Sequence, residues 1–461
     1  MEKNVGEIEP RLFKGTRDFL PDMMSRKQYM TDKLRVIFER YGFEPVETPA
    51  MEFYDILVGK YGGESEKLIY PLAYRDGKTL ALRYDLTVPL ARLVAMHPEL
   101  PLPFKRYQMQ PVWRADNPQL RQGRFREFVQ CDVDTVGAAS VLADAEIMGM
   151  IDTCLMELGI RRFLLKVSHR QILPALVDLL LADATPSRVA ELIRIMDKHD
   201  KVGTEGVRRE LGTAGLIEKA IDFMIEIINI KGTSAERFEA ITKLIDQYAQ
   251  KHGRTARLAQ ILARLNEAID QLRIIYDALR NQGIDESHYE FYPALARDLA
   301  YYTGPIFEAV LPDQPHIGSL CGGGRYDKLI GRYAGREVPA TGTTIGLDRI
   351  IAAMEQLDLL PASGTKVDAL VCLFDEASAG ATQRAAAALR KAGLNVDTYF
   401  EPEKLKKQFS YADKRGIPAV VVIGPDEYEA NKATVKNMKT GEQKLVAFDD
   451  MAQTVRQLTR Q

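Results

Sequence analysis

The most informative stretch of the chain spans residues 125–136 and reads FREFVQCDVDTV. If it forms a β-strand, alternate side chains lie on opposite faces. One face would then carry Phe125, Glu127, Val129, Cys131 and Val133. The other face would carry Arg126, Phe128, Gln130, Asp132 and Asp134. That second face is either an ordinary solvated sheet surface or a platform for a polar ligand. As a platform, it would offer an aromatic ring to stack on a base and polar groups to hydrogen-bond a small substrate.

Directly upstream, Trp113 and Arg114 precede a polar loop, residues 115–123, which Arg124 follows. Two strands joined by such a loop form a hairpin, with Arg114 at the end of its first strand. A guanidinium group binds phosphate oxygens through a planar fork of donors. A single arginine is usually a plain surface residue, so Arg114 indicates a phosphate site only in combination with the other motifs.

Residues 82–89 read LRYDLTVP and should end a strand and begin a helix at Thr87 or Pro89. Asp85 and Thr87 are adequately explained there as helix caps. A carboxylate at this point could equally hold the ammonium group of a ligand.

Three further segments combine glycine, aromatic residues and arginine. Residues 296–304, ARDLAYYTG, should form a strand with two tyrosines near Arg297. Residues 321–326, CGGGRY, match neither common glycine-rich nucleotide motif, so a tight turn or a close backbone approach to a ligand is expected. A helix expected over residues 345–357 has Arg349 in its first turn, where a cation opposes the helix dipole and favours an anionic partner.

The chain divides into segments with different predicted secondary structure. A helix is expected over residues 25–40 and a strand edge over residues 43–49. Residues 172–282 are almost wholly helical by pattern and look like an insertion, because strand-like sequence returns afterwards. Residues 361–366 look like a linker, and residues 367–461 alternate strands and helices as in a small parallel or mixed sheet.

The composition is that of an ordinary globular protein. The 461 residues include 62 basic and 64 acidic ones, giving a net charge of −2, which argues against general coating of nucleic acid but allows local basic patches. The four cysteines form no CxxC pair and the six histidines no HExxH motif, so no zinc held by the protein is expected. The low number of cysteines agrees with a reducing cytoplasm. Neither a secretion signal nor a membrane span is expected.

Taken in order, these segments resemble the motifs of class II aminoacyl-tRNA synthetases, and specifically the histidyl-tRNA synthetase family. The similar segments are 14–21 (N-terminal signature), 42–49 (first class II motif, dimer interface), 82–89 (first histidine motif), 113–134 (second class II motif), 296–304 (second histidine motif), 342–349 (third class II motif) and 367–461 (anticodon-binding domain).

The resemblance implies an α+β class II catalytic domain, in which helices flank an antiparallel sheet, with a helical insertion and a C-terminal α/β anticodon-binding domain. The domains expected from it are 1–171 (catalytic, first part), 172–282 (helical insertion), 283–360 (catalytic, second part), 361–366 (linker) and 367–461 (anticodon-binding).

The resemblance also assigns roles residue by residue. The residues implied to bind histidine are Asp85, Leu86, Thr87, Arg114, Gln130, Asp134, Arg297, Tyr301 and Tyr302. Those implied to bind ATP are Arg114, Arg124, Arg349 and Phe128, whose ring stacks on adenine. Arg297 and Arg114 are implied to be catalytic, with Arg297 beside the reacting α-phosphate.

The implied reaction activates L-histidine with ATP to histidyl-adenylate and transfers histidine to the 3′ end of tRNA(His). Mg²⁺ is expected with ATP, as is a cytoplasmic homodimer without DNA or membrane partners. The insertion is expected to clamp the tRNA acceptor stem. A helix over residues 403–415 could meet an RNA loop through its lysines, Phe409 and Tyr411, or could be an ordinary solvated helix.

Two residues depart from the family's second histidine motif, Arg-Gly-Leu-Asp-Tyr-Tyr: Asp298 replaces the glycine and Ala300 the aspartate. They favour one alternative, a non-catalytic histidine-binding regulatory subunit of ATP phosphoribosyltransferase. A second alternative is an RNA-binding or signalling module built on an inactive synthetase fold. Retention of Arg114, Arg297 and Arg349, together with the C-terminal domain, favours the ligase.

Overall fold

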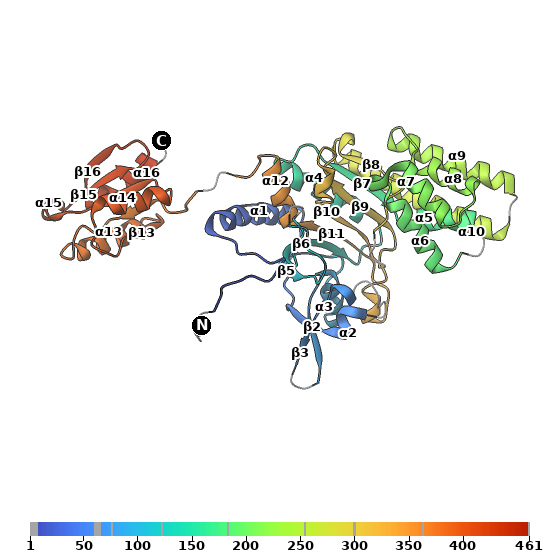
Figure 1. Ribbon diagram of the computed structural model, residues 1–461, viewed down its shortest axis with the longest axis horizontal. Coiled ribbons are helices and arrows are strands. Elements are labelled where there is room, and N and C mark those ends of the chain that lie inside the picture. Colours follow the sequence, from blue (N-terminus) through green and yellow to red (C-terminus); the bar gives the residue numbers. More distant parts are fainter. Residues whose placement is uncertain are drawn as a thin grey trace, which may run out of the picture. The chain divides into compact units, whose positions relative to one another are not determined.

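The computed structural model (Figure 1) describes residues 8–59, 66–74, 77–120, 123–181, 184–252, 255–297, 301–361 and 364–459. Contacts divide the chain into two compact units, one built mainly from residues 27–360 and the other mainly from residues 361–459.

The first unit is organised around a large, mostly antiparallel sheet. Its strands, from one edge to the other, are β1 (Glu44–Pro45), β5 (Phe104–Trp113), β6 (Glu127–Val136), β11 (Ala340–Gly346), β10 (Cys321–Arg325), β9 (Pro305–Val310), β7 (Leu164–His169) and β8 (Tyr289–Phe291). Only the edge strands β1 and β8 run parallel to their neighbours. β1 is shorter than the predicted strand edge, as expected for a segment in which proline removes backbone donors.

Strand β6 contains most of the segment 125–136, which was predicted to form a strand. It begins at Glu127, so the predicted alternation applies only from there on. Gln130, Asp132 and Asp134 are 3%, 1% and 2% exposed, and the interpretation of a solvated sheet face is therefore wrong. Between β5 and β11, Asp134 lies opposite Arg106 on one side and Gly342 on the other.

Of the two predictions for the glycine-rich segment 321–326, the tight turn is wrong, because Cys321–Arg325 form strand β10, and the close backbone approach to a ligand stays a prediction. A Cβ atom on Gly323 would lie 2.0 Å from the carbonyl oxygen of Gly342, and one on Gly322 would lie 1.8 Å from Nη1 of Arg297. Side chains are therefore excluded here by close approach to a neighbouring strand and to an arginine.

Helices pack against the main sheet. α1 (Pro21–Arg40) begins earlier than predicted and buries Met30, Leu34, Ile37 and Phe38, the residues at helical spacing. α4 (Leu142–Glu157) packs on β6, β10 and β11, and α12 (Leu347–Gln356) packs on β6 and β11. The predicted α12 started two residues too early, since β11 continues to Gly346. A short 3-10 helix, η5 (Pro315–Ile317), contacts α12.

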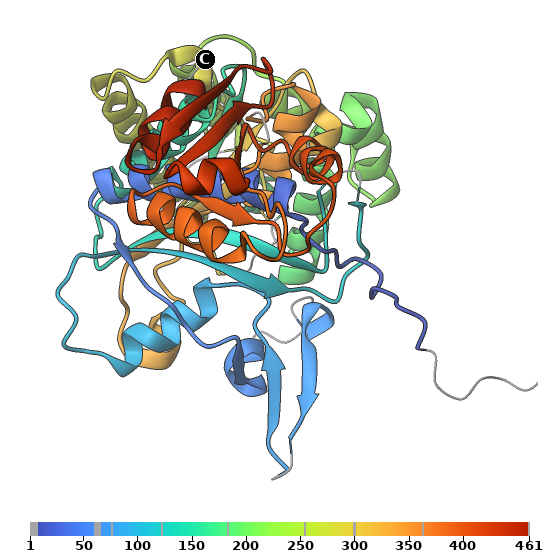
Figure 2. The same ribbon diagram turned by 90° about the vertical axis from the view of Figure 1, so that its left-hand side faces the viewer.

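A small sheet projects from the main one (Figures 1 and 2). Its strands, in spatial order, are β2 (Met51–Phe53), β4 (Thr79–Leu82) and β3 (Tyr70–Ala73). The nearby helices are α2 (Tyr54–Val58), η2 (Glu66–Leu68), α3 (Thr87–Met96) and α11 (Gly331–Ala334). α3 begins at Thr87, one of its two predicted starting points.

The segment between β7 and β8 is helical, as its sequence pattern indicates. Its helices are α5 (Ile172–Leu180), α6 (Pro186–Asp197), α7 (His199–Thr213), α8 (Glu218–Ile228), α9 (Ser234–His252) and α10 (Ala256–Asn281), followed by η4 (Glu286–His288). α10 packs on α4, α5 and β7, which joins this helical insertion to the rest of the unit.

The second unit contains a mixed sheet flanked by helices, as predicted. Its strands, in spatial order, are β13 (Val396–Thr398), β12 (Ala369–Val371), β14 (Ala419–Val422), β15 (Lys432–Asn437) and β16 (Gln443–Ala447). Its helices are α13 (Ala379–Lys391), α14 (Leu405–Lys414), α15 (Pro425–Glu429), η6 (Phe448–Asp450) and α16 (Met451–Thr459). β15 and β16 form an antiparallel hairpin that the sequence analysis did not anticipate.

Candidate active site

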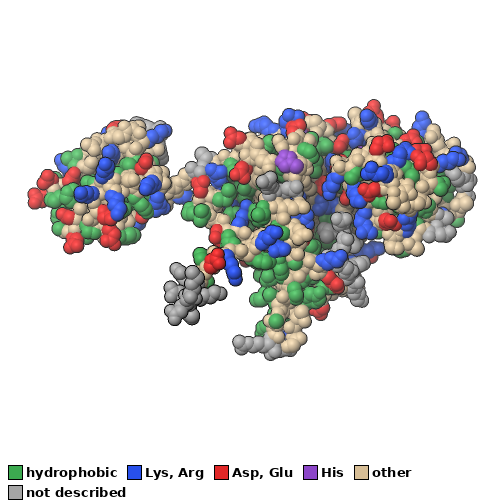
Figure 3. Space-filling model, viewed as in Figure 1, with side chains coloured by type: hydrophobic (Ala, Val, Ile, Leu, Met, Phe, Trp, Pro, Cys, Tyr) green, Lys and Arg blue, Asp and Glu red, His purple; other side chains and the backbone are tan. Residues whose placement is uncertain are grey.

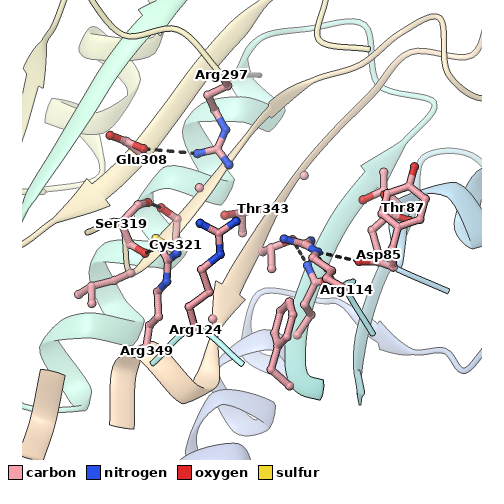
Figure 4. Close-up of a pocket in the computed structure, with 18 of the residues that line it drawn as sticks. Asp85, Thr87, Arg114, Arg124, Arg297, Glu308, Ser319, Cys321, Thr343 and Arg349 are labelled. Atoms are coloured by element: carbon pink, nitrogen blue, oxygen red, sulfur yellow. Dashed lines mark hydrogen bonds and ion pairs between the residues drawn. The ribbon is translucent and has the colours of Figure 1, made fainter. Parts of the chain in front are cut away.

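A cavity of about 490 Å³ lies over the central strands of the main sheet (Figure 4). This volume is within the usual range of small-molecule sites, about 300–1,000 Å³. Its wall combines segments that are far apart in the sequence. The predicted site residues that line it are Asp85, Thr87, Arg114, Arg124, Phe128, Gln130, Asp134, Arg297, Tyr301, Tyr302 and Arg349.

Leu86 is the predicted site residue that does not line the cavity. Its side chain is fully buried, and its carbonyl oxygen accepts a hydrogen bond from Nη2 of Arg106 at 3.3 Å. The leucine side chain therefore anchors the start of α3 in the protein interior, and contact of Leu86 with histidine stays a prediction.

Asp85 uses its two carboxylate oxygens differently. Oδ1 accepts the backbone N–H of Val88 at 3.3 Å, which confirms the helix-capping interpretation. Oδ2 is buried without a hydrogen-bond partner. Burial raises the pKa of Asp85 to about 6, although the positive charge of Arg114 acts in the opposite direction. One half of this carboxylate thus remains available to a ligand.

Asp134 is held by two buried groups. Its Oδ2 forms an ion pair with Nη2 of Arg106 at 2.6 Å, and its Oδ1 accepts a hydrogen bond from the hydroxyl of Tyr326. Burial raises the pKa of Asp134, while Arg106 opposes the shift. Such a network fixes the carboxylate before any ligand arrives.

Gln130 links this acidic end of the cavity to Arg114. Its Nε2 donates to Oγ1 of Thr344 at 3.1 Å, and its Oε1 accepts from Nη2 of Arg114 at 3.4 Å. Nε of Arg114 donates to the carbonyl oxygen of Tyr84 at 2.9 Å, and its guanidinium lies 5.1 Å from the ring centroid of Phe128. These contacts hold Arg114 between the amide and the aromatic ring.

The four predicted arginines face the same cavity (Figure 4). Arg124 forms an ion pair with Asp116, and Nη1 of Arg349 donates to the carbonyl oxygen of Ser319 at 2.7 Å. Burial lowers the pKa of Arg349, and the nearby charges of Arg124 and Arg114 lower it further. Positive charges that oppose each other in this way favour the binding of a polyanion.

Among the described residues, four buried polar atoms on the cavity wall lack both a hydrogen bond and an ion pair. They are Oδ2 of Asp85, Oδ1 of Asp116, Oγ1 of Thr343 and Nε of Arg297. Buried polar groups in folded proteins are nearly always paired, so an unpaired set around one cavity indicates a ligand with both donors and acceptors.

The second predicted histidine motif differs from its expected structure. The described residues 301–304 are irregular, and strand β9 begins only at Pro305. Tyr301 and Tyr302 nevertheless lie together, with ring centroids 4.9 Å apart. Asp298 and Ala300, the two departures from the family pattern, lie outside the described residues.

The sequence analysis missed several residues of the site. Glu308 and Thr343 line the cavity from β9 and β11, and Arg106 supports Asp134 from β5. Glu308 could have been noticed as the single charge in the apolar strand PIFEAV. Arg106 could not, since its role depends on the strand register that places it opposite Asp134.

Both units are similar to known proteins. Residues 15–350 match the family model described as histidyl-tRNA synthetase, and residues 364–458 match an anticodon binding domain. The chain is 40% identical to a histidine–tRNA ligase of Cytophaga hutchinsonii, over 96% of this chain and 98% of the relative. It is 38% identical to the corresponding protein of Gloeobacter violaceus, over 96% and 97%.

The fold has solved counterparts as well. A histidyl-tRNA synthetase from Nostoc sp. PCC 7120 superposes with a TM-score of 0.81 at 31% identity, covering 98% of this chain and all of the other. An ATP phosphoribosyltransferase regulatory subunit/histidyl-tRNA synthetase from Bacillus halodurans has a TM-score of 0.70 at 22% identity, covering 90% and 99%, and shows the shared fold alone. The expected class II catalytic fold with a C-terminal anticodon-binding domain is confirmed. The chain belongs to the histidyl-tRNA synthetase family.

Proposed function

We propose that this protein ligates histidine to tRNA(His) in the cavity described above, in two steps. Histidine and ATP form histidyl-adenylate and pyrophosphate, and the histidyl group then passes to the 3′ end of the tRNA. The observation that carries the proposal is the convergence of four arginines beside a buried pair of carboxylates in one cavity.

The acidic end of the cavity is proposed to bind histidine. Its polar side chains belong to Asp85, Thr87, Gln130, Asp134, Tyr301 and Tyr302. The carboxylate of Asp85 suits the substrate ammonium group, and the carboxylate of Asp134 with the amide and hydroxyl groups suits the two imidazole nitrogens. A site of this kind rejects apolar side chains by about 10⁴–10⁵, because its buried polar groups would remain unpaired.

The basic end is proposed to bind ATP. Arg114, Arg124 and Arg349 would contact the phosphates, and Phe128 would stack on adenine. In the first step a carboxylate attacks a phosphorus atom, so two anions must approach each other. Arg297 is proposed to stabilise the charge that develops at the α-phosphate, as preorganised donors do in other enzymes.

Mg²⁺ is proposed to accompany ATP. Its usual partners are nucleotide phosphates with one or two carboxylates and water. Glu308 is the carboxylate proposed for this role, because it lines the cavity beside Arg297, the arginine proposed to lie at the α-phosphate. Bound there, the ion would neutralise phosphate charge. Among the described residues, no group of three or more His, Cys, Asp or Glu side chains is arranged to hold a metal.

The second unit is proposed to contact the anticodon, and the helical insertion the acceptor stem. In helix α14 the two rings predicted to stack on RNA are partly buried. Phe409 packs on the unit's core, and the hydroxyl of Tyr411 donates to Oδ2 of Asp397 at 2.9 Å. Contact with RNA by α14 would therefore depend on exposed lysines such as Lys406 and Lys414.

A homodimer is proposed because residues 42–49 resemble the first class II motif, and an exposed apolar surface on the segment that follows them supports it. Met51 and Phe53 of β2 and Tyr74 after β3 are all exposed, and Figure 3 shows hydrophobic side chains gathered in this region. Burial of such a surface against a second copy would stabilise a dimer. Light scattering should give twice the mass of the chain, whereas the mass of one chain would contradict the dimer.

The cytoplasm is the proposed compartment. The four cysteines, Cys131, Cys154, Cys321 and Cys372, are buried and unpaired, which suits a reducing environment. None of the helices in the described ranges has the length and apolar character needed to traverse a bilayer.

Histidine-dependent exchange between ATP and pyrophosphate tests the first step and separates the ligase from its alternatives. The purified protein should exchange label when histidine is present, and should show only background with other amino acids. A folded protein that binds histidine without exchange would instead be a regulatory subunit.

A further inference from the structure

The helical insertion reaches the cavity at one corner, where α6 ends at Asp197 and α7 begins at His199. The side chains of Asp197 and Lys201, from this corner, line the same cavity as the four arginines. The corner also touches the segment between β8 and β9, which carries Arg297 and both cavity tyrosines.

Two sets of contacts join the corner to this segment. Oδ1 of Asp197 accepts the backbone N–H of Ala296 at 2.9 Å, one residue before Arg297. Four residues upstream, the hydroxyl of Tyr292 hydrogen-bonds to Asp200 and lies 3.1 Å from Nδ1 of His199. The segment is thus fixed to the insertion at both of these points.

The second contact is reinforced from the main sheet. Lys166 of β7 forms an ion pair with Asp200, and its Nζ lies 4.1 Å from the ring centroid of Tyr292. Burial opposes ionisation of Asp200, but hydrogen bonds from Lys166 and Tyr292 outweigh it and lower the pKa of Asp200. One polar cluster therefore joins the main sheet, the helical insertion and the segment between β8 and β9.

The side chain of Arg297 has restraints of its own. Its Nη1 lies 3.7 Å from Oε2 of Glu308 and donates to the carbonyl oxygen of Phe307 at 3.4 Å, and its guanidinium lies 5.8 Å from the ring centroid of Tyr302. The backbone beside it belongs to no helix or strand, and the carbonyl oxygen of Arg297 accepts from Nη1 of Arg170 at 3.5 Å. The hydrogen bond from Ala296 to Asp197 is shorter, at 2.9 Å, so we infer that it contributes most to fixing this backbone.

We propose that the α6–α7 corner positions Arg297, with Asp197 as the principal positioning residue. The insertion would then support adenylate formation itself, in addition to its proposed contact with tRNA. This inference rests on the proposed function, because it assigns Asp197 a part in the same first step.

The test compares Asp197→Ala with Asp197→Asn and Asp270→Ala in histidine-dependent exchange. Asp270 is a matched control: it lies on α10 of the same insertion, exposed, and pairs with Arg273.

Asp197→Ala should lower kcat by about 10-fold or more, since a small misplacement of a catalytic group can cost up to about 10². KM for histidine should change by less than about 2-fold, a shift smaller than the loss of a hydrogen bond to the substrate would cause. Asp197→Asn keeps an oxygen acceptor and should recover most of the lost rate.

A double mutant separates positioning from general damage. If Asp197 acts through Arg297, adding Asp197→Ala to Arg297→Ala should cause no further loss of kcat. Independent losses that multiply would overturn the proposal. Tyr292→Phe, which removes only the hydroxyl of the second contact, serves as a further probe if Asp197→Ala unfolds, and should also lower kcat.

The outcomes distinguish this inference from the proposed function. Wild-type protein without exchange would contradict the function itself. Normal wild-type exchange, with Asp197→Ala and Tyr292→Phe as active as Asp270→Ala, would contradict only the positioning role.

Discussion

The two ends of the cavity are built in different ways. At the acidic end, Gln130 and Asp134 project from the middle of the sheet and are held by neighbouring strands through Thr344 and Arg106. At the basic end, Arg124 and Arg297 stand on segments outside helices and strands, and Arg349 stands at the start of a helix. The strand residues of the proposed histidine site are therefore held by the sheet, whereas Tyr301 and Tyr302 of the same site, like most of the arginines proposed to bind ATP, lie outside helices and strands.

Loss of Arg106 should have the largest effect on stability. It is fully buried, and Arg106→Met would leave Asp134 without its ion-pair partner. Breaking a buried pair on one side costs about 3–5 kcal/mol, against about 0–1 kcal/mol for an exposed pair. Urea unfolding at pH 8 measures the difference, with Arg124→Met as the control from the other end. Equal losses for the two variants would show that the ends are not built differently.

Arg297→Ala should affect activity and not stability. We expect a large loss of exchange activity and little change in the free energy of unfolding. Removal of one donor to the developing charge is expected to lower kcat for exchange by about 10² or more. The measurement is exchange at saturating ATP and histidine, with the unfolding midpoint as control. Near-normal exchange would mean that this arginine does not contact the reacting phosphate.

Asp134→Asn should affect the two substrates unequally. The loss of a hydrogen bond to a charged group corresponds to about 1.5–3 kcal/mol, so KM for histidine should rise by about 10-fold or more. KM for ATP should stay close to the wild-type value, because the nucleotide is assigned to the other end. A rise in both constants by the same factor would count against separate subsites.

Acidification should cause a smaller change in the KM for histidine. Burial raises the pKa of Asp85 to about 6, and its ionised form is the one that can hold the substrate ammonium group. Binding supported by this charge is therefore present above pH 6 and lost as the pH falls through that value. KM for histidine should rise a few-fold between pH 7 and pH 5.5, on the scale of about 0.5–1.5 kcal/mol for one hydrogen bond.

Asp85→Asn isolates this contribution, because the imidazole of free histidine titrates in the same range. The variant should show a flatter dependence of KM on pH than the wild-type protein. Identical pH profiles would indicate that Asp85 does not titrate at the histidine subsite.

The sequence predicted most of the site because its motifs are local. The capping pattern around Asp85 and the position of Arg349 in the first turn of a helix are properties of a few neighbouring residues. The predictions failed where distant segments decide the structure. A tight turn was one of two predictions for Gly322 and Gly323, yet both lie in a strand because β9 and β11 pair with it on either side.

The same reason explains the residues that were missed. Arg106 is one of many basic residues until the register between β5 and β6 places it opposite Asp134. Asp197 lies in the middle of a helical sequence, and only packing of the insertion brings it to Ala296. Tertiary contacts of this kind leave no periodic signal in the chain.

A crystal structure of the protein with histidine and a non-hydrolysable ATP analogue would test the central claim most directly. The account predicts the imidazole ring beside Gln130 and Asp134, adenine against Phe128, and the phosphates within ion-pair distance of Arg114 and Arg349. A nucleotide bound outside this cavity, or an amino acid bound at its basic end, would contradict it.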